Sequence, residues 1–259
     1  MHNKQWKGKR NMSQNVLVVH GGGPTAVINA SLYGVIEEAK RNPEVGKVYG
    51  AIGGTGAIFS ETFIDLTSFD DEKLKLLLHT PASAIGSSRY PLYEKDYEKM
   101  VDIFKKHDIK YVLLNGGNGT MDACGHIYEV CKDQDIKVVG IPKTIDNDIA
   151  MTDHSPGYGS AARFIAASTQ EVGEDVKSLP IHVCIMEAMG RNAGWITAAS
   201  ALARRKQGDA PHLIYLPERN FNEDEFLEDV SRLQKKQGGV VVLVSELSLI
   251  HISEPTRLL

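Results

Sequence analysis

This sequence has few cysteines, no long apolar run and no large excess of one charge. Each of these absences excludes some classes of function. Its 259 residues include three cysteines, Cys124, Cys131 and Cys184, and none of them belongs to a C-x-x-C pair. We therefore expect buried free thiols in the reducing environment of the cytoplasm.

No apolar run reaches the roughly 18 residues that a membrane-spanning helix needs. The basic N-terminus also lacks the apolar segment of a secretory signal. The net charge is −4 with both signs interspersed, so the sequence offers no basic face to nucleic acid. These features predict a protein whose partners are neither a membrane nor nucleic acid.

What the sequence does contain is a regular alternation of short apolar runs and longer amphipathic segments. Strands are predicted at 15–20, 47–52, 111–115, 138–141, 181–186, 212–216 and 240–245. Helices are predicted between them, at 26–40, 71–79, 95–107, 120–131, 160–176, 193–206 and 223–236. Runs such as VLVV at 16–19 are apolar throughout, which fits strands covered on both faces. The pattern predicts a doubly wound α/β fold with mostly parallel sheets.

Composition shifts mark a boundary inside the chain and at each end. Thr, Asp, Ser, Pro and Gly cluster at 149–159, so we expect two lobes, at 13–155 and 156–246. We expect residues 1–12 to be a non-native leader. The final LSLIHISEPTRLL, at 247–259, resembles read-through of a sequencing adaptor and is expected to be a non-native tail. An ordinary terminal tail is the alternative.

Glycine-rich turns follow two of the predicted strands, at the strand ends where doubly wound sheets bind ligands. Gly21-Gly22-Gly23 and Gly116-Gly117-Asn118-Gly119 each open a predicted helix, whose N-terminus attracts phosphate. A tight turn without a ligand and a dinucleotide site are alternatives for the first, although no carboxylate ends the second strand as a dinucleotide site requires. Thr120 could simply cap the helix after the other turn. Arg89 suits a phosphate chain but could equally be a solvated surface arginine.

The most specific segment is Pro142-Lys143-Thr144-Ile145-Asp146-Asn147-Asp148, which leaves a predicted strand. If the stretch is extended, Asp146 and Asp148 project to the same side. One could take a proton from a hydroxyl while the other orients it or helps to hold a metal. An Asx-rich turn is the alternative. Further along, Met189-Gly190-Arg191 also joins a strand to a helix, and an arginine at a helix start is unfavourable unless it meets an anion.

Taken in this order, these segments resemble the phosphofructokinase family over residues 16–246. The resemblance implies a donor-binding lobe, then a sugar-phosphate-binding lobe, with the active site between them. Both lobes would be incomplete here, because family members continue beyond this point. It also implies phosphoryl transfer to the 1-hydroxyl of fructose 6-phosphate in glycolysis, with Mg²⁺ as cofactor and a homo-oligomeric enzyme.

The resemblance assigns roles by position in this sequence. Asp146 matches the catalytic base that removes the proton from the sugar hydroxyl, and Lys143, Thr144 and Arg191 match residues at the reacting phosphoryl group. Sugar binding is implied for Thr144, Asp146, Asp148, Met189, Gly190, Arg191 and Glu246. Donor binding is implied for Gly22, Gly23, Arg89, Gly117, Asn118 and Gly119.

Two positions point to different phosphoryl donors. Lys143 resembles the branch that uses pyrophosphate, in which the lysine stabilises the leaving group, whereas Gly119 leaves room for the nucleotide of ATP. We expect pyrophosphate, with ATP as the alternative. Asn118 stands where many relatives have a magnesium-binding aspartate, so Asn118 and Asp148 are both weak candidates for a metal site. His182 stands where many relatives have an arginine that reaches a neighbouring subunit's sugar phosphate.

Other functions stay open at this point. The turn at 116–120 also resembles the loop of NAD and diacylglycerol kinases, which lack the segments around Asp146 and Arg191. A dehydrogenase would need the ribose-binding acid that is absent. Asn118, His182 and the early end of the chain also allow a non-catalytic phosphate-binding paralogue or fragment.

Overall fold

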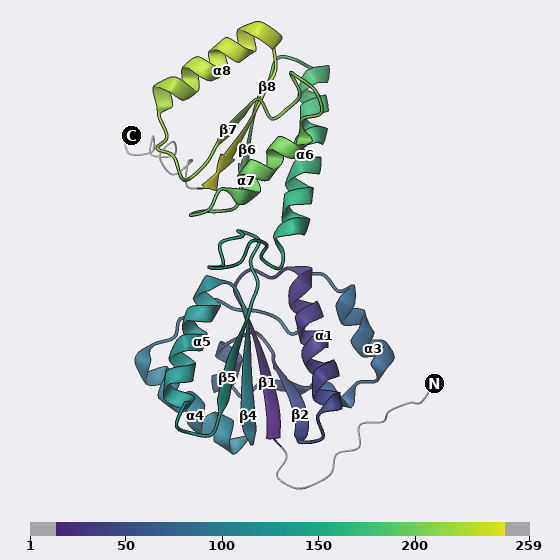
Figure 1. The fold of residues 1–259 in the computed structure, drawn as a ribbon, viewed down its shortest axis with the longest axis vertical. Coiled ribbons are helices and arrows are strands. Elements are labelled where there is room, and N and C mark those ends of the chain that lie inside the picture. The colour runs from purple at the N-terminus through teal and green to yellow at the C-terminus, as the bar shows by residue number, and fades with distance from the viewer. Residues whose placement is uncertain (1–13, 247–259) are drawn as a thin grey trace. The chain divides into compact units, whose positions relative to one another are not determined.

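The computed structural model describes residues 14–246. They form two compact units that divide between Lys143 and Thr144, and each unit is a sheet with helices on both faces (Figure 1). This arrangement confirms the predicted doubly wound α/β architecture. Among the described residues, no helix combines the length and the apolar character needed to cross a membrane.

The first unit is built on a five-stranded sheet in the order β3-β2-β1-β4-β5. Its strands are β1 (Gln14–Gly21), β2 (Val45–Ala51), β3 (Phe63–Asp65), β4 (Ile109–Gly116) and β5 (Lys137–Pro142). Neighbours are parallel except β2 and β3, which are antiparallel. The apolar run of β1 is central and buried, as its sequence predicts.

Helices cover both faces of this sheet because side chains alternate along each strand. α1 (Ala26–Arg41) and α3 (Asp71–Lys75) lie on one face, and α4 (Glu94–Lys106) and α5 (Asn118–Cys131) on the other (Figure 1). Val18 of β1 belongs to a buried cluster with Leu32 of α1, whereas its neighbour Leu17 belongs to a cluster with Phe104 of α4.

The second unit has a three-stranded parallel sheet in the order β6-β8-β7. Its elements are α6 (Tyr158–Ser178), β6 (Val183–Ala188), α7 (Trp195–Ala199), β7 (Leu213–Tyr215), α8 (Glu223–Gln237) and β8 (Val240–Ser245). β8 is buried along its whole length. Its residues Val241 and Leu243 pack with α6 and α7, while Val242 and Val244 pack toward α8 (Figure 1).

The predicted strands and helices are all present, with ends that shift by a few residues. The predicted helix at 71–79 is α3 followed by a 3₁₀ turn, and the one at 193–206 is α7 followed by another. Neither β3 nor the short α2 (Gly56–Phe59) was predicted, because three or four residues are too few to show a hydrophobic period.

The division between the units lies earlier than the expected boundary after residue 155. The Thr144 N–H donates to Pro156 O (3.1 Å), and the Ser155 N–H donates to Asn147 Oδ1 (2.7 Å). These bonds fold residues 144–155 against the start of α6, so they group with the second unit. The expected leader at 1–12 and tail at 247–259 lie outside the described residues.

The three cysteines differ in exposure. Cys124 and Cys131 are buried, as expected, whereas Cys184 is partly exposed. Burial raises the pKa of the Cys131 thiol to about 11, so this group is protonated and unreactive at neutral pH.

Candidate active site

The glycine-rich turns of the first unit begin side by side at one edge of its sheet. β1, β4 and β5 are parallel, with Gly21 opposite Gly116 and Gly116 opposite Pro142. The segments that follow the three strands therefore leave from neighbouring carboxyl ends, the position at which doubly wound sheets bind ligands.

Thr120 explains why the strand ends must be glycine. A Cβ atom at Gly21 or at Gly116 would lie 2.3 Å from Thr120 Oγ1. The threonine is buried in the first turn of α5, where it packs the two strand ends together. It does not cap the helix, because the N-cap position of α5 is Gly117, which has no side chain.

The N-terminus of α5 is suited to an anion. Its first turn contains Asn118 and Gly119 and no acidic residue. The first backbone N–H groups of a helix lack partners within the helix and lie at the positive end of its dipole. A Cβ atom at Gly119 would meet nothing within 4 Å, so the space beside this residue is open. A phosphate could bind here through backbone donors.

The turn that precedes Arg89 is bonded to the first glycine turn. The Gly22 N–H donates to Ser88 O (3.1 Å), and Ser87 Oγ donates to Gly22 O (2.6 Å). Both backbone groups of Gly22 are therefore engaged, and its amide is not open to a phosphate in this conformation. Gly22 adopts φ +73°, which an amino acid with a side chain rarely does. Arg89 follows directly and is exposed.

Lys143 is a buried lysine at the end of β5. Its residue is 5% exposed, its ammonium donates to Gly23 O, and its own N–H donates to Gly116 O (2.9 Å). Burial, and to a smaller extent the charge of Lys143, lowers the pKa of His20 to about 4. A buried ammonium is favourable only near compensating oxygen atoms, and a phosphate bound among the glycine turns would supply more of them.

The segment with the two aspartates belongs to the second unit and forms a tight turn. The Asp146 N–H donates to Thr144 Oγ1 (3.0 Å), and Asn147 has φ +58°, in the left-handed region. The stretch is therefore not extended, and the condition for Asp146 and Asp148 to project to the same side is not met.

Asn147 fixes this turn and was not singled out by the sequence prediction. Its side-chain amide donates to Asp153 O (3.2 Å) and accepts from the Ser155 N–H (2.7 Å), and the residue is buried. Asparagine tolerates the left-handed conformation better than most residues. An asparagine between two aspartates after a strand was the signal that could have identified it.

The predicted sugar-binding residues of the second unit follow neighbouring strands. β6 and β8 are parallel, with Ala188 opposite Ser245, so Arg191 and Glu246 come from adjacent strand ends. Arg191 Nε lies 3.8 Å from Glu246 Oε1. Met189, in the same turn as Arg191, is exposed.

The turn after β6 depends on Gly190 and on a residue that the sequence prediction missed. Gly190 has φ +118°, and a Cβ atom there would lie 2.4 Å from Ala193 O. Glu218 Oε1 accepts a hydrogen bond from the Gly194 N–H (2.7 Å), just before α7. Because Glu218 lies far along the chain, no local pattern could have linked it to this turn.

The predicted residues thus fall into two groups, one in each unit. Lys143 ends the first group and Thr144 begins the second. His182 precedes β6 and so lies at the opposite end of that strand from Met189, with its Nδ1 3.1 Å from Leu179 O.

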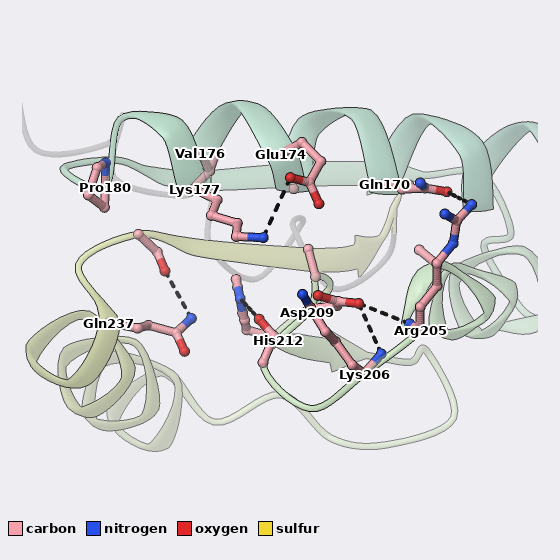
Figure 2. A pocket seen from close by; sticks show the side chains of 15 residues that line it. Gln170, Glu174, Val176, Lys177, Pro180, Arg205, Lys206, Asp209, His212 and Gln237 are labelled. Atoms are coloured by element: carbon pink, nitrogen blue, oxygen red, sulfur yellow. Dashed lines mark hydrogen bonds and ion pairs between the residues drawn. The ribbon is translucent and has the colours of Figure 1, made fainter.

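Figure 2 shows a pocket of about 590 Å³ in the second unit that none of the predicted site residues lines. Pro180, His212 and Gly239 line it and come just before β6, β7 and β8. It therefore lies at the amino ends of these strands, away from the carboxyl ends that carry Arg191 and Glu246.

The family model described as "Phosphofructokinase" matches residues 15–254. A pyrophosphate–fructose 6-phosphate 1-phosphotransferase of Halomonas elongata is 41% identical over 243 residues, which cover 90% of this chain and 58% of the relative. The enzyme of the same name from Rhodospirillum rubrum is 43% identical over 233 residues, 89% of this chain and 57% of the relative.

A solved structure shows the same likeness in three dimensions. The pyrophosphate-dependent phosphofructokinase of Marinobacter aquaeolei has a TM-score of 0.82 and 40% identity, over 91% of this chain and 61% of that one. The chain thus spans somewhat more than half the length of the curated relatives it matches. From its family match, its fold and its glycine-rich strand ends, the chain belongs to the phosphofructokinase family.

Proposed function

We propose that the chain is part of an enzyme that transfers a phosphoryl group from pyrophosphate to the 1-hydroxyl of fructose 6-phosphate. The products are fructose 1,6-bisphosphate and phosphate. The observation that carries the proposal is the buried Lys143 ammonium beside the glycine turns, three residues before Asp146. The names of the relatives from Halomonas elongata and Rhodospirillum rubrum support it.

The residues suit a transfer that depends on position and charge. Asp146 accepts the proton of the 1-hydroxyl as that oxygen bonds to the nearer phosphorus of pyrophosphate. The bond from this phosphorus to the bridging oxygen breaks, and the second phosphate leaves with the electron pair. Lys143 stabilises its charge, and the N-terminus of α5 binds phosphate oxygens.

The sugar would be bound by the turn that carries Arg191 and by Glu246. Arginine suits the sugar phosphate or the transferred group because its guanidinium offers a planar set of donors. A carboxylate such as Glu246 accepts hydrogen bonds from sugar hydroxyls. Thr144 and Met189 complete the proposed set, and Gly190 lets the backbone approach the sugar closely.

Magnesium would enter with the phosphates. Among residues 14–246, no group of three or more His, Cys, Asp or Glu side chains could hold a metal ion. Mg²⁺ is often bound by substrate phosphates and only one or two carboxylates, and the residues present fit that mode. We assign Asp148 as the carboxylate that would approach it, with the Asn118 amide as a weaker ligand. When bound, the ion would neutralise phosphate charge.

ATP is the second candidate donor, and the open space beside Gly119 is the observation that favours it. A nucleotide needs room beyond its transferred phosphate, and nothing lies within 4 Å of the place that a Cβ atom of residue 119 would take. Lys143 favours the smaller pyrophosphate, whose charge is confined to fewer atoms. A cytoplasmic homo-oligomer, which the family resemblance implies, stays a prediction.

Calorimetric titration of the 259-residue chain with magnesium pyrophosphate and with magnesium ATP tests the donor. We expect pyrophosphate to bind at least about tenfold more tightly. Lys143→Ala should weaken its binding about 100-fold, because a buried charged contact is lost. Lys137→Ala, an exposed lysine on the same strand, is the matched control and should change little. Equal or tighter ATP binding would overturn the choice of pyrophosphate, and unchanged binding by Lys143→Ala would overturn the role of the lysine.

A further inference from the structure

His20 is a buried histidine beside the proposed donor site, and the proposed phosphoryl transfer gives it no role. It is the second-last residue of β1, directly before the first glycine turn, and it is fully buried. Histidine is less common than aliphatic residues at such positions. Its imidazole therefore needs a physical explanation.

The hydrogen bonds around His20 assign its tautomer. His20 Nδ1 lies 2.8 Å from Ser83 Oγ, and Ser83 Oγ donates its one proton to Gly86 O (2.8 Å). Ser83 must then accept from His20, so the ring carries its proton on Nδ1. Nε2 is left as a buried acceptor with no hydrogen-bond partner.

The ring stays neutral because of its surroundings. Burial is the larger cause and the nearby Lys143 ammonium the smaller one, and together they lower the pKa of His20 to about 4. A protonated imidazole would place a second buried positive charge close to Lys143. Neutrality leaves the Nδ1–H as the single donor that the ring offers.

The Nδ1–H of His20 bonds to a segment that itself bonds to two other turns of the first unit. Ser83 begins the 83–88 segment, whose Ser88 O accepts from the Gly22 N–H (3.1 Å). In the same segment, Ile85 O accepts from the Gly53 N–H (2.9 Å) in the turn after β2. The His20–Ser83 bond thus connects the end of β1 to the segment that orients the first glycine turn and precedes Arg89.

A role in packing alone does not account for the histidine. Its unpartnered Nε2 costs free energy in the core, and an aliphatic side chain of similar size would avoid that cost. What an aliphatic residue would lose is the bond to Ser83. The choice of residue therefore points to the placement of the 83–88 segment.

We propose that His20 is a positioning residue for the phosphoryl donor, which through Ser83 sets the first glycine turn and Arg89 at the place where the diphosphate binds. This inference rests on the proposed function. It assigns His20 an effect on donor affinity without direct contact with the donor.

Three variants test the inference through calorimetric titration with magnesium pyrophosphate. His20→Leu removes the hydrogen-bond donor, Ser83→Ala removes the side chain that accepts from it, and His20→Asn restores an N–H near the position of Nδ1. We expect His20→Leu and Ser83→Ala each to weaken pyrophosphate binding about tenfold, as one lost hydrogen bond would. The double variant should be no weaker than either, because both remove the same bond. His20→Asn should stay within about threefold of the wild type.

Ile109→Ala is the control for general loss of stability. Ile109 is buried at the start of β4, at the opposite end of the sheet from the glycine turns. It should lower the melting temperature without changing pyrophosphate affinity. If it weakens binding as much as His20→Leu, or if His20→Leu binds like the wild type, the inference is overturned. If His20→Leu does not fold, Ser83→Ala against His20→Asn decides in the same way. A wild type that does not bind pyrophosphate would instead overturn the proposed function, and the inference with it.

Discussion

The two units prepare their proposed ligand residues to different degrees. In the first unit Lys143 is 5% exposed and donates to Gly116 O, and the first glycine turn is bonded to Ser87 and Ser88. In the second unit Met189 is 55% exposed, and the side chain of Arg191 is 67% exposed. The proposed donor half, in the first unit, is therefore largely preorganised by its own fold. The proposed sugar half, in the second unit, must lose more side-chain entropy when a ligand binds.

The largest effect that we expect concerns the second unit and its proposed base. Asp146→Asn keeps the shape of the side chain but cannot accept the proton, so turnover should fall about 10²–10⁴-fold. The measurement is the rate of fructose 1,6-bisphosphate formation from fructose 6-phosphate and pyrophosphate. Asp153→Asn, an exposed aspartate near the same turn, is the control. A loss of less than about fivefold would exclude Asp146 as the base.

A smaller effect, on stability, tests the buried charge balance of the first unit. The folded pKa of His20, about 4, lies below its unfolded value of 6.5. Above pH 6.5 the ring is neutral in both states and adds no pH dependence. As the pH falls from 6.5 to 4, the unfolded state takes up a proton that the folded state does not, so stability falls by roughly 3 kcal/mol at most.

His20→Asn isolates this contribution. The excess stability of the wild type over the variant, from urea unfolding at each pH, should shrink as the pH falls from 7 to 4. Groups such as Glu61 and Asp65, whose pKa values salt bridges and hydrogen bonds lower, titrate in both proteins and cancel. A difference that does not change with pH would show that the pKa of the ring is the same in the folded and unfolded states, as it is for a ring exposed to water.

The same contrast explains how far the sequence could predict the structure. The apolar runs of β1 and β8 predicted that both strands are buried in parallel sheets, because strands covered on both faces are apolar throughout. The glycine turns were found because their position after strands has a local signature. The division between the two units depends instead on hydrogen bonds such as those of Asn147, which a composition shift does not reveal.

Residues that act through distant partners were beyond a reading of local patterns. His20 bonds to Ser83, 63 positions along the chain, and Glu218 bonds to Gly194, 24 positions away. Each partner is set by strand order and loop path, which periodicity does not specify. A capping role for Thr120 was an open alternative because the local pattern allowed it, whereas the packing of Gly21 and Gly116 gives it another role.

A third prediction tests how tightly the donor half is packed. Gly21→Ala would place a Cβ atom 2.3 Å from Thr120 Oγ1, so the variant should lose about 1–3 kcal/mol of unfolding free energy. Adding Thr120→Ala should recover part of that loss, which a double-mutant cycle measures. Gly23→Ala meets no atom within 4 Å and should change stability by less than about 0.5 kcal/mol. Equal losses at Gly21 and Gly23 would contradict the close-packed picture.

The smallest effect concerns the ion pair of the sugar half. Arg191 Nε lies 3.8 Å from Glu246 Oε1, and the two side chains are 67% and 31% exposed. Water and salt therefore screen their attraction. A double-mutant cycle with Arg191→Gln and Glu246→Gln in urea unfolding should give a coupling below about 1 kcal/mol. Added salt should weaken it further. If the pair is weak, both side chains can turn toward a ligand, Arg191 toward a sugar phosphate and Glu246 toward the hydroxyls of the sugar, as the proposed sugar binding requires. A coupling above about 2 kcal/mol would mean that the two side chains are committed to each other, and that the second unit is as preorganised as the first.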